Sequence, residues 1–255
     1  MTETTAEIIY EHPLNEQIRT YLRLENLFNL QFELRESELV SSHLCALQNL
    51  WEILDCLDRG DIKGEILKEL ELQKKHFKQL QGSPYIDELK LVRFLEQLDK
   101  LLHWINNYRG KFGAQLREDR FIDLIKHRIR IPGGSCSFDL PELYHFLQQP
   151  AANRTLKLKQ YFSHLDGLYQ CIKILMRLFR ENGQFTPVAI QNGSYQHQFD
   201  KKQKPHLVRI KLGKKDNLFP EVSGSSYCFT VRFLKSEPQQ VIPYNDELTF
   251  SLAIC

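Results

Sequence analysis

The segment IPGGSCSFDLPEL, residues 131–143, carries more local structural information than any other part of the chain. The Pro-Gly-Gly run at 132–134 should end the preceding helix, because proline blocks a helix and glycine tolerates positive φ. Asp139 and Glu142 have the spacing of a capping box, and Phe138 stands at the staple position before the cap. The segment therefore predicts a helix stop followed at once by a new helix.

Helical periodicity extends from this segment back toward the N-terminus. Apolar residues recur at steps of three and four, the pattern of amphipathic helices. Pro13 is expected to open the first helix, because the first turn does not use the N–H that proline lacks. The predicted helices cover about 13–34, 61–80, 85–107, 115–129 and 140–148, and a final pair of helical segments spans 153–181. A further helix is predicted to begin at Ser37 or at Ser41-Ser42 and to end at Gly60.

Residues 61–107 are predicted to form a long antiparallel helical hairpin. Its turn is expected at Gly82-Ser83-Pro84, and the second helix has leucines at coiled-coil spacing from Leu91 to Leu102. Two interpretations of these apolar stripes stay open. They belong to the core of the domain, or one of them forms the seam of a dimer.

After Gly183 the period of the apolar residues changes from helical to two-fold. Alternating segments at 208–212, 227–233 and 248–254 predict strands, and a hairpin is expected around Asn192-Gly193-Ser194. One face of each strand is apolar, so we expect an antiparallel sheet packed against the helices. The prediction is an α+β protein with a helical domain at 1–183 and an antiparallel β domain at 184–255.

Composition is typical of a globular protein of one or two domains. The 255 residues are 42% hydrophobic and 26% charged, and no apolar run reaches the length of a membrane span. The first residues contain acids and lack the basic and apolar regions of a signal peptide, so a cytosolic location is expected. The six cysteines are scattered without C-x-x-C spacing, which favours isolated thiols.

Catalytic motifs are missing from the sequence. It contains no phosphate-binding loop, no dinucleotide-binding glycine pattern and no H-E-x-x-H. The run at 133–137 departs from G-x-S-x-G at Ser137, and nothing orients Cys136 with a histidine. We therefore expect neither an enzyme, nor a metal site, nor a cofactor.

Positive charge is the remaining functional signal. Residues 201–235 contain nine Lys and Arg but only two acids, although the net charge of the whole chain is only +2. Arg209, Lys211 and Arg232 share the polar parity of their strands and are expected to project from one sheet face. A guanidinium fork suits a carboxylate. For the lysines of the predicted loops, the simpler interpretation is a solvated surface: Lys201, Lys202, Lys204, Lys214 and Lys215.

Several segments together resemble the ZapD family of bacterial cell-division proteins. The resemblance runs in the same order from about residue 8 to the end of the chain, and it is weakest over 27–50, 84–110 and 184–205. The segments that carry it are Glu11–Glu16, Arg19–Arg23, Asp58–Gly60, Glu65–Leu70, Phe112–Gly113, Leu116–Arg120, Ile131–Pro141, Leu218–Gly224 and Val231–Phe233.

The resemblance implies a function and a site. ZapD proteins bind FtsZ and bundle its filaments at midcell, as dimers with a helical and a β domain. A basic pocket between the domains takes the C-terminal peptide of FtsZ. By motif, Arg59, Arg120 and Arg232 fall on the family's basic positions. Arg117, Arg209 and Lys211 are added to this set from charge and parity.

One position departs from the pattern. Cys228 stands where the family carries arginine, and Arg209 and Lys211 are the residues that would compensate. The alternative from a different class is a nucleic-acid-binding module that uses the basic sheet face. Base stacking would need aromatic residues at the polar parity of the strands, whereas Tyr227, Phe229 and Phe233 have the apolar parity.

Overall fold

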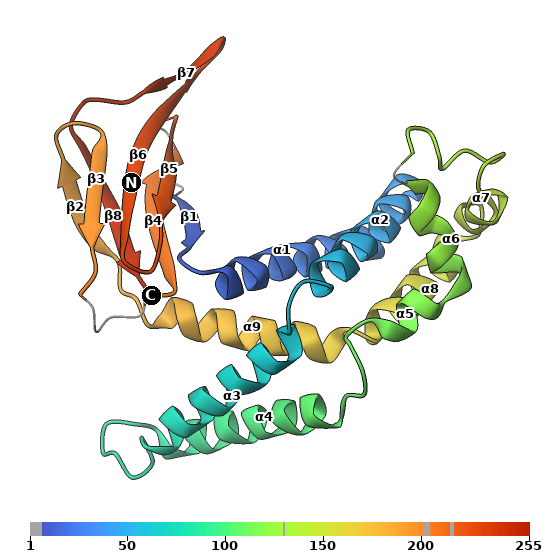
Figure 1. Cartoon of the computed structure of the whole chain (residues 1–255), viewed down its shortest axis with the longest axis horizontal. Coiled ribbons are helices and arrows are strands. Elements are labelled where there is room, and N and C mark those ends of the chain that lie inside the picture. Colours follow the sequence, from blue (N-terminus) through green and yellow to red (C-terminus); the bar gives the residue numbers. More distant parts are fainter. Residues whose placement is uncertain (1–6, 130, 201–204, 215–216) are drawn as a thin grey trace, which may run out of the picture. The chain divides into compact units, whose positions relative to one another are not determined.

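The computed structural model describes residues 7–129, 131–200, 205–214 and 217–255 (Figure 1). The helices are α1 Glu16–Glu36, α2 Val40–Leu57, α3 Ile62–Lys78, α4 Glu88–Asn107, α5 Ala114–Glu118, α6 Arg120–Ile129, α7 Pro141–Leu147, α8 Ala151–Ser163 and α9 Asp166–Glu181. The strands are β1 Glu7–Pro13, β2 Thr186–Ile190, β3 Ser194–Gln198, β4 Leu207–Gly213, β5 Leu218–Gly224, β6 Cys228–Glu237, β7 Gln240–Pro243 and β8 Leu248–Ile254. The predicted α+β class is confirmed.

The chain divides into two units by packing. Met1–Leu22 and Met176–Cys255 form the sheet unit, and Arg23–Leu175 forms the helical unit. The sheet unit thus combines both ends of the chain. The predicted boundary between domains 1–183 and 184–255 stays a prediction, because these units are defined by packing and not by independent folding.

The strands of the sheet unit form two antiparallel sheets in the described part of the chain. One has the order β1-β4-β8-β2, and the other has the order β3-β6-β5 with β7 beside the end of β6. Their apolar faces share one core, in which Val208, Ile210, Phe229, Val231 and Phe233 are buried. The expected single sheet on helices is therefore wrong. The two-fold pattern indicated that each strand has one buried face. It could not show that this face packs against a second sheet.

The predicted hairpin at 188–199 is also wrong. β2 pairs with β8 in one sheet, whereas β3 pairs with β6 in the other. Between them Gly193 has φ +60, and a Cβ at this position would collide with the carbonyl oxygen of Tyr244. This close backbone approach explains the glycine, and the turn carries the chain from one sheet to the other instead of back along β2.

Pro13 ends a strand and does not open a helix. β1 pairs with β4 along its whole length, from Glu7 opposite Gly213 to Pro13 opposite Leu207. A proline is tolerated there because β1 is an edge strand. The helix begins after Asn15, whose Oδ1 accepts a hydrogen bond from the N–H of Ile18 at 2.8 Å.

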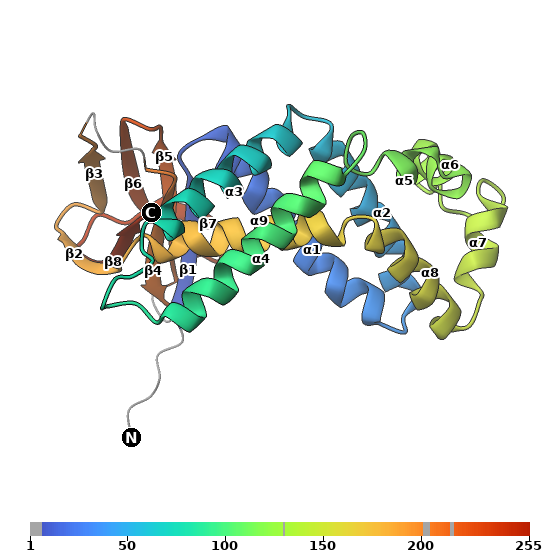
Figure 2. The ribbon, with the colours of Figure 1, turned by 90° about the horizontal axis from the view of Figure 1, so that it is seen from below.

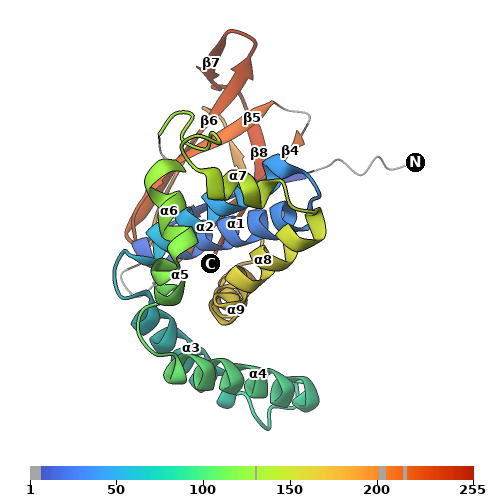
Figure 3. The ribbon, with the colours of Figure 1, turned by 90° about the vertical axis from the view of Figure 1, so that its right-hand side faces the viewer.

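In the helical unit, α3 and α4 lie side by side over the range of the predicted hairpin (Figure 2). The leucine stripe of α4 is buried, including Leu95 and Leu98. Around α2 pack α6, α7 and α8 (Figure 3). The indole Nε1 of Trp51 on α2 donates to the carbonyl oxygen of Ile122 on α6 at 3.1 Å.

The helix predicted at 115–129 is broken at Asp119. This residue is extended, with ψ 122°, and its Oδ1 accepts a hydrogen bond from the N–H of Ile122 at 3.0 Å. An aspartate that caps the next helix in this way ends α5 and begins α6. Arg117 and Arg120 therefore lie on separate helices.

The predicted capping box at 139–142 is wrong as well. α7 begins at Pro141, so Leu140 is its N-cap and supplies no side-chain hydrogen bond. Asp139 instead accepts from Nη1 of Arg128 at 3.3 Å, and Phe138 is 82% exposed and forms no staple. The predicted stop is present, since Gly133 has φ +73 and a Cβ on Gly134 would collide with the carbonyl oxygen of Arg128.

Candidate partner-binding site

The six predicted site residues divide between the two units. Arg59, Arg117 and Arg120 belong to the helical unit, and Arg209, Lys211 and Arg232 belong to the sheet unit. They differ sharply in exposure and in what they contact within their own unit.

Arg117 fastens the helical unit internally. Its side chain is 22% exposed, and it donates to the carbonyl oxygens of Leu54 at 2.7 Å and Phe112 at 2.8 Å. The carboxylate of Asp58 lies 2.9 Å from Nη2. Although its buried Nε has no hydrogen-bond partner among the described residues, these contacts tie the end of α2 to the segment before α5, which is a structural role.

Arg120 is 76% exposed and lines an open pocket of about 320 Å³. Its Nη2 donates to both oxygens of Glu142, at 2.8 and 2.7 Å. The rings of Phe121 and Phe146 lie 5.5 Å apart at this pocket, and Lys157 also lines it. The pocket thus combines cations with aromatic carbon.

Tyr161 also lines this pocket. Its hydroxyl donates to Oδ1 of Asp119 at 3.4 Å. Burial, with the charge of Asp119, raises the pKa of Tyr161, so this hydroxyl stays protonated. Asp119 is thus held by Tyr161 and by the cap of α6.

Arg59 is exposed just after α2 and lines a second open pocket of about 410 Å³. Arg23 on α1 lines the same pocket, together with Glu52 and Asp55 of α2. Burial raises the pKa of the Cys56 thiol in this pocket, although the charges of Arg23 and Arg59 oppose the shift. Arg23 was not among the predicted site residues, although it stands in one of the segments that resemble the family.

Arg209 is held in a cluster inside the sheet unit. Its side chain is 16% exposed, and its Nε donates to Oε1 of Glu11 at 2.9 Å, directly across the β1–β4 pair. Arg180 also binds Glu11, through Nε and Nη2 at 2.8 and 2.7 Å. Burial raises the pKa of Glu11, but the hydrogen bonds and charges of the two arginines outweigh it, so the net pKa is lowered.

Lys211 is also engaged within the sheet unit. Its Nζ lies 3.2 Å from Oε2 of Glu7 and 4.6 Å from the centre of the Phe185 ring. The guanidinium of Arg209 lies over the same ring. A cation over an aromatic face is stabilised by the ring quadrupole.

Arg232 is 69% exposed on β6, between the buried Val231 and Phe233. This confirms its predicted parity. Its Nη2 donates to Oε2 of Glu221 at 2.8 Å, directly opposite on β5. The expectation that Arg232 shares a sheet face with Arg209 and Lys211 is wrong, because β4 and β6 belong to different sheets.

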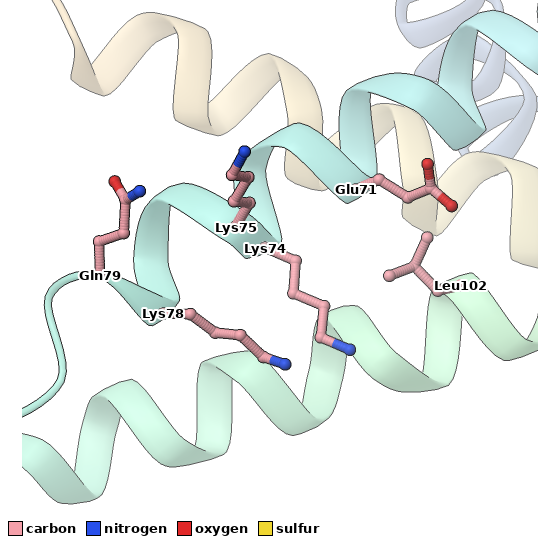
Figure 4. A pocket seen from close by; sticks show the side chains of 6 residues that line it. All are labelled: Glu71, Lys74, Lys75, Lys78, Gln79 and Leu102. Atoms are coloured by element: carbon pink, nitrogen blue, oxygen red, sulfur yellow. The ribbon is translucent and has the colours of Figure 1, made fainter.

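A third open pocket, on the α3–α4 hairpin, holds none of the predicted residues. Lys74 and Lys78 extend from α3 toward α4, whereas Lys75 points away from it (Figure 4). Lys74 is paired with Asp99 of α4. Lys75 and Lys78 are exposed, as is usual for lysines on the solvated face of a helix.

Other kinds of site find no support in the described residues. No group of three or more His, Cys, Asp or Glu is placed there to hold a metal ion. Within the same ranges, none of the helices combines the length and the hydropathy that a membrane crossing requires.

Comparison with known proteins decides the family. The model of the ZapD family, described as cell division protein, matches residues 22–232. Cell division protein ZapD of Pectobacterium carotovorum subsp. carotovorum (strain PC1) is 35% identical over 257 residues, with both chains fully covered. Cell division protein ZapD of Escherichia coli O17:K52:H18 (strain UMN026 / ExPEC) is 35% identical over 255 residues, 98% of this chain and 99% of the relative.

The chain belongs to the ZapD family. The resemblance noted from the sequence motifs is thereby confirmed, and with it a role in cell division. In this ZapD family member Cys228 is half-buried at the start of β6. Because Arg209 and Lys211 are committed to Glu11 and Glu7, neither is placed as a free substitute for an arginine there.

Proposed function

We propose that this chain binds the C-terminal tail of FtsZ and, as a homodimer, cross-links FtsZ filaments at midcell and so promotes assembly of the division ring. The observation that carries the proposal is the exposure of Arg120 and Arg232, each with a single surface carboxylate as ion-pair partner within the described residues. An exposed guanidinium retains N–H donors for the carboxylates of a partner peptide.

The six predicted residues receive two roles in this proposal. Arg59, Arg120 and Arg232 contact the tail, because all three are exposed. Arg117, Arg209 and Lys211 support the site from within their own units, because carboxylates and carbonyls of the same unit already hold them. The basic pocket between domains stays a prediction.

The proposed mechanism is multivalent binding without catalysis or cofactor. A dimer offers two tail sites, and a filament presents one tail for each subunit. Linking weak contacts makes each further contact effectively intramolecular, so avidity exceeds the affinity of a single tail. Weak contacts also allow cross-links to exchange.

Co-sedimentation with FtsZ tests the proposal. The protein should pellet with FtsZ filaments and bundle them, and both effects should vanish when FtsZ lacks its C-terminal tail. Bundling that persists without the tail would contradict the proposed site. Tight binding of duplex DNA or RNA in a salt titration would favour the nucleic-acid alternative. Phe229 and Phe233 are buried and cannot stack on bases. The expectation that Tyr227 is turned inward with them is wrong, because it precedes β6 and is 76% exposed.

A further inference from the structure

Two exposed arginines among the predicted site residues share a feature that the buried ones lack. Arg120 and Arg232 are each bound by one glutamate of their own unit, Glu142 from the first turn of α7 and Glu221 from β5. Within the described residues, these pairs are the only hydrogen bonds of the two side chains. Both glutamates are themselves exposed.

Each pair leaves most of the guanidinium unused. The two hydrogen bonds of Arg120 and the single bond of Arg232 all come from Nη2. Arginine has five N–H donors, and within the described residues the N–H groups of Nε and of Nη1 have no hydrogen-bond partner in either arginine. A second carboxylate can approach there before the first one leaves.

The pairs are also weak enough to exchange. An exposed ion pair is worth little in water, because solvent screens it and two long side chains lose freedom. The carboxylates that hold Arg117 and Arg209 differ, since those arginines are mostly buried and make further internal contacts. Exchange is therefore confined to Arg120 and Arg232.

The surroundings of Glu142 indicate what replaces it. The pocket at Arg120 offers the rings of Phe121 and Phe146 for an apolar side chain, with Lys157 as a further cation. An acidic peptide with an apolar residue beside its carboxylate matches this combination of charge and carbon. Such a peptide has to compete with Glu142 for the guanidinium.

We propose that Glu142 and Glu221 occupy Arg120 and Arg232 in the free protein as internal competitors, and that carboxylates of the bound peptide displace them. The inference rests on the proposed function, in which that peptide is the FtsZ tail. The glutamates lower the affinity of each contact and disfavour peptides that carry no carboxylate. They keep single contacts weak, so that only arrayed tails bind well.

Binding of a synthetic FtsZ tail peptide, followed by titration calorimetry, tests this inference in the full-length protein. Glu142→Gln and Glu221→Gln should each lower Kd about two- to five-fold, because each removes one exposed competing charge. The matched control is Glu36→Gln, which removes an exposed carboxylate paired with Lys159 at 2.8 Å outside the site and should leave Kd unchanged. The same peptide with its carboxylates converted to amides should show no gain from either variant.

Each other outcome has a distinct meaning. If wild type binds the tail and both variants bind equally well or more weakly, the glutamates are not competitors and the inference is overturned. An equal gain in Glu36→Gln would also overturn it, because net charge would then explain the effect. If neither wild type nor any variant binds the tail, the proposed function itself fails and the inference fails with it.

Discussion

At the scale of single residues, Arg117 and Arg120 should separate stability from binding. Arg117→Ala leaves the carbonyl oxygens of Leu54 and Phe112 without their donor, so the free energy of unfolding should fall by about 2–4 kcal/mol. Arg120→Ala removes a solvent-exposed pair and should change it by no more than about 0.5 kcal/mol. Urea unfolding measures both, and equal losses would contradict the distinction.

Glu11 should make stability depend on pH. Its folded-state pKa is lowered below the ordinary 4.5, so it stabilises the fold above that pH and the contribution is lost as pH falls through the lowered pKa. Glu11→Gln should cost about 2–4 kcal/mol at pH 7, because it leaves Arg180 and Arg209 without their shared carboxylate. The difference in the free energy of unfolding between wild type and Glu11→Gln, measured with urea, should be smaller at pH 3 than at pH 7. A difference that is the same at both pH values would contradict this assignment.

Arg232→Glu should abolish binding of the FtsZ tail while the protein stays folded. Reversing an exposed charge removes a charge-assisted contact worth about 1.5–3 kcal/mol and adds repulsion, which is about ten- to hundred-fold or more in affinity. Arg232→Gln is the milder companion, since it does not place two acids opposite each other on β5 and β6. Peptide binding measured by fluorescence anisotropy, with circular dichroism for the fold, provides the test.

A lysine-to-glutamate variant away from Arg232 tells a shaped site from diffuse charge. Lys201, an obvious choice from the sequence, lies outside the described residues, whereas Lys214 is exposed just after β4. Lys214→Glu should weaken tail binding far less than Arg232→Glu. Equal losses would mean that the positive surface acts as a whole, and wild-type affinity in Arg232→Glu would place the site elsewhere.

At the scale of elements, the turn at Gly193 decides how the sheets are connected. Gly193→Ala should lower the free energy of unfolding by about 2–4 kcal/mol, because the new Cβ meets both a positive φ and the carbonyl of Tyr244. Gly110→Ala is the matched control, since Gly110 has φ +74 but open space around it and should cost only about 1–2 kcal/mol. Thermal unfolding of the two variants should rank them in this order. Equal losses would mean that the turn tolerates a side chain.

The helices were predictable because their signals are local. Steps of three and four along α4 reflect the buried side of a single helix, so no knowledge of its neighbours was needed. The two-fold pattern of β4, β6 and β8 was equally local. What covers an apolar face, and which strand lies beside which, depends on contacts between distant segments, so the second sheet and the pairing of β1 with β4 were missed.

The candidate site was predictable only in its residue types. Motif positions identified Arg120 and Arg232, and both are exposed as a binding role requires. The partners of these arginines could not be foreseen, because Glu142 lies 22 residues from Arg120 along the chain and its predicted role was a helix cap. Charge alone also failed to separate Arg117 and Arg209, which are held internally, from arginines available to a ligand.

At the scale of the whole molecule, cross-linking should respond to salt more steeply than binding of a single tail. Screening weakens each charged contact by the same increment of free energy, and a cross-link contains two such contacts. The slope of log affinity against log salt should therefore be about twice as large for bundling, measured by light scattering, as for one peptide, measured by anisotropy. The comparison needs a dimer, and multi-angle scattering at micromolar concentration should give twice the mass of 30.2 kDa. A monomer with equal slopes would contradict the proposed cross-linking, whereas a dimer with equal slopes would mean that only one of its tail sites is engaged in each bundle contact.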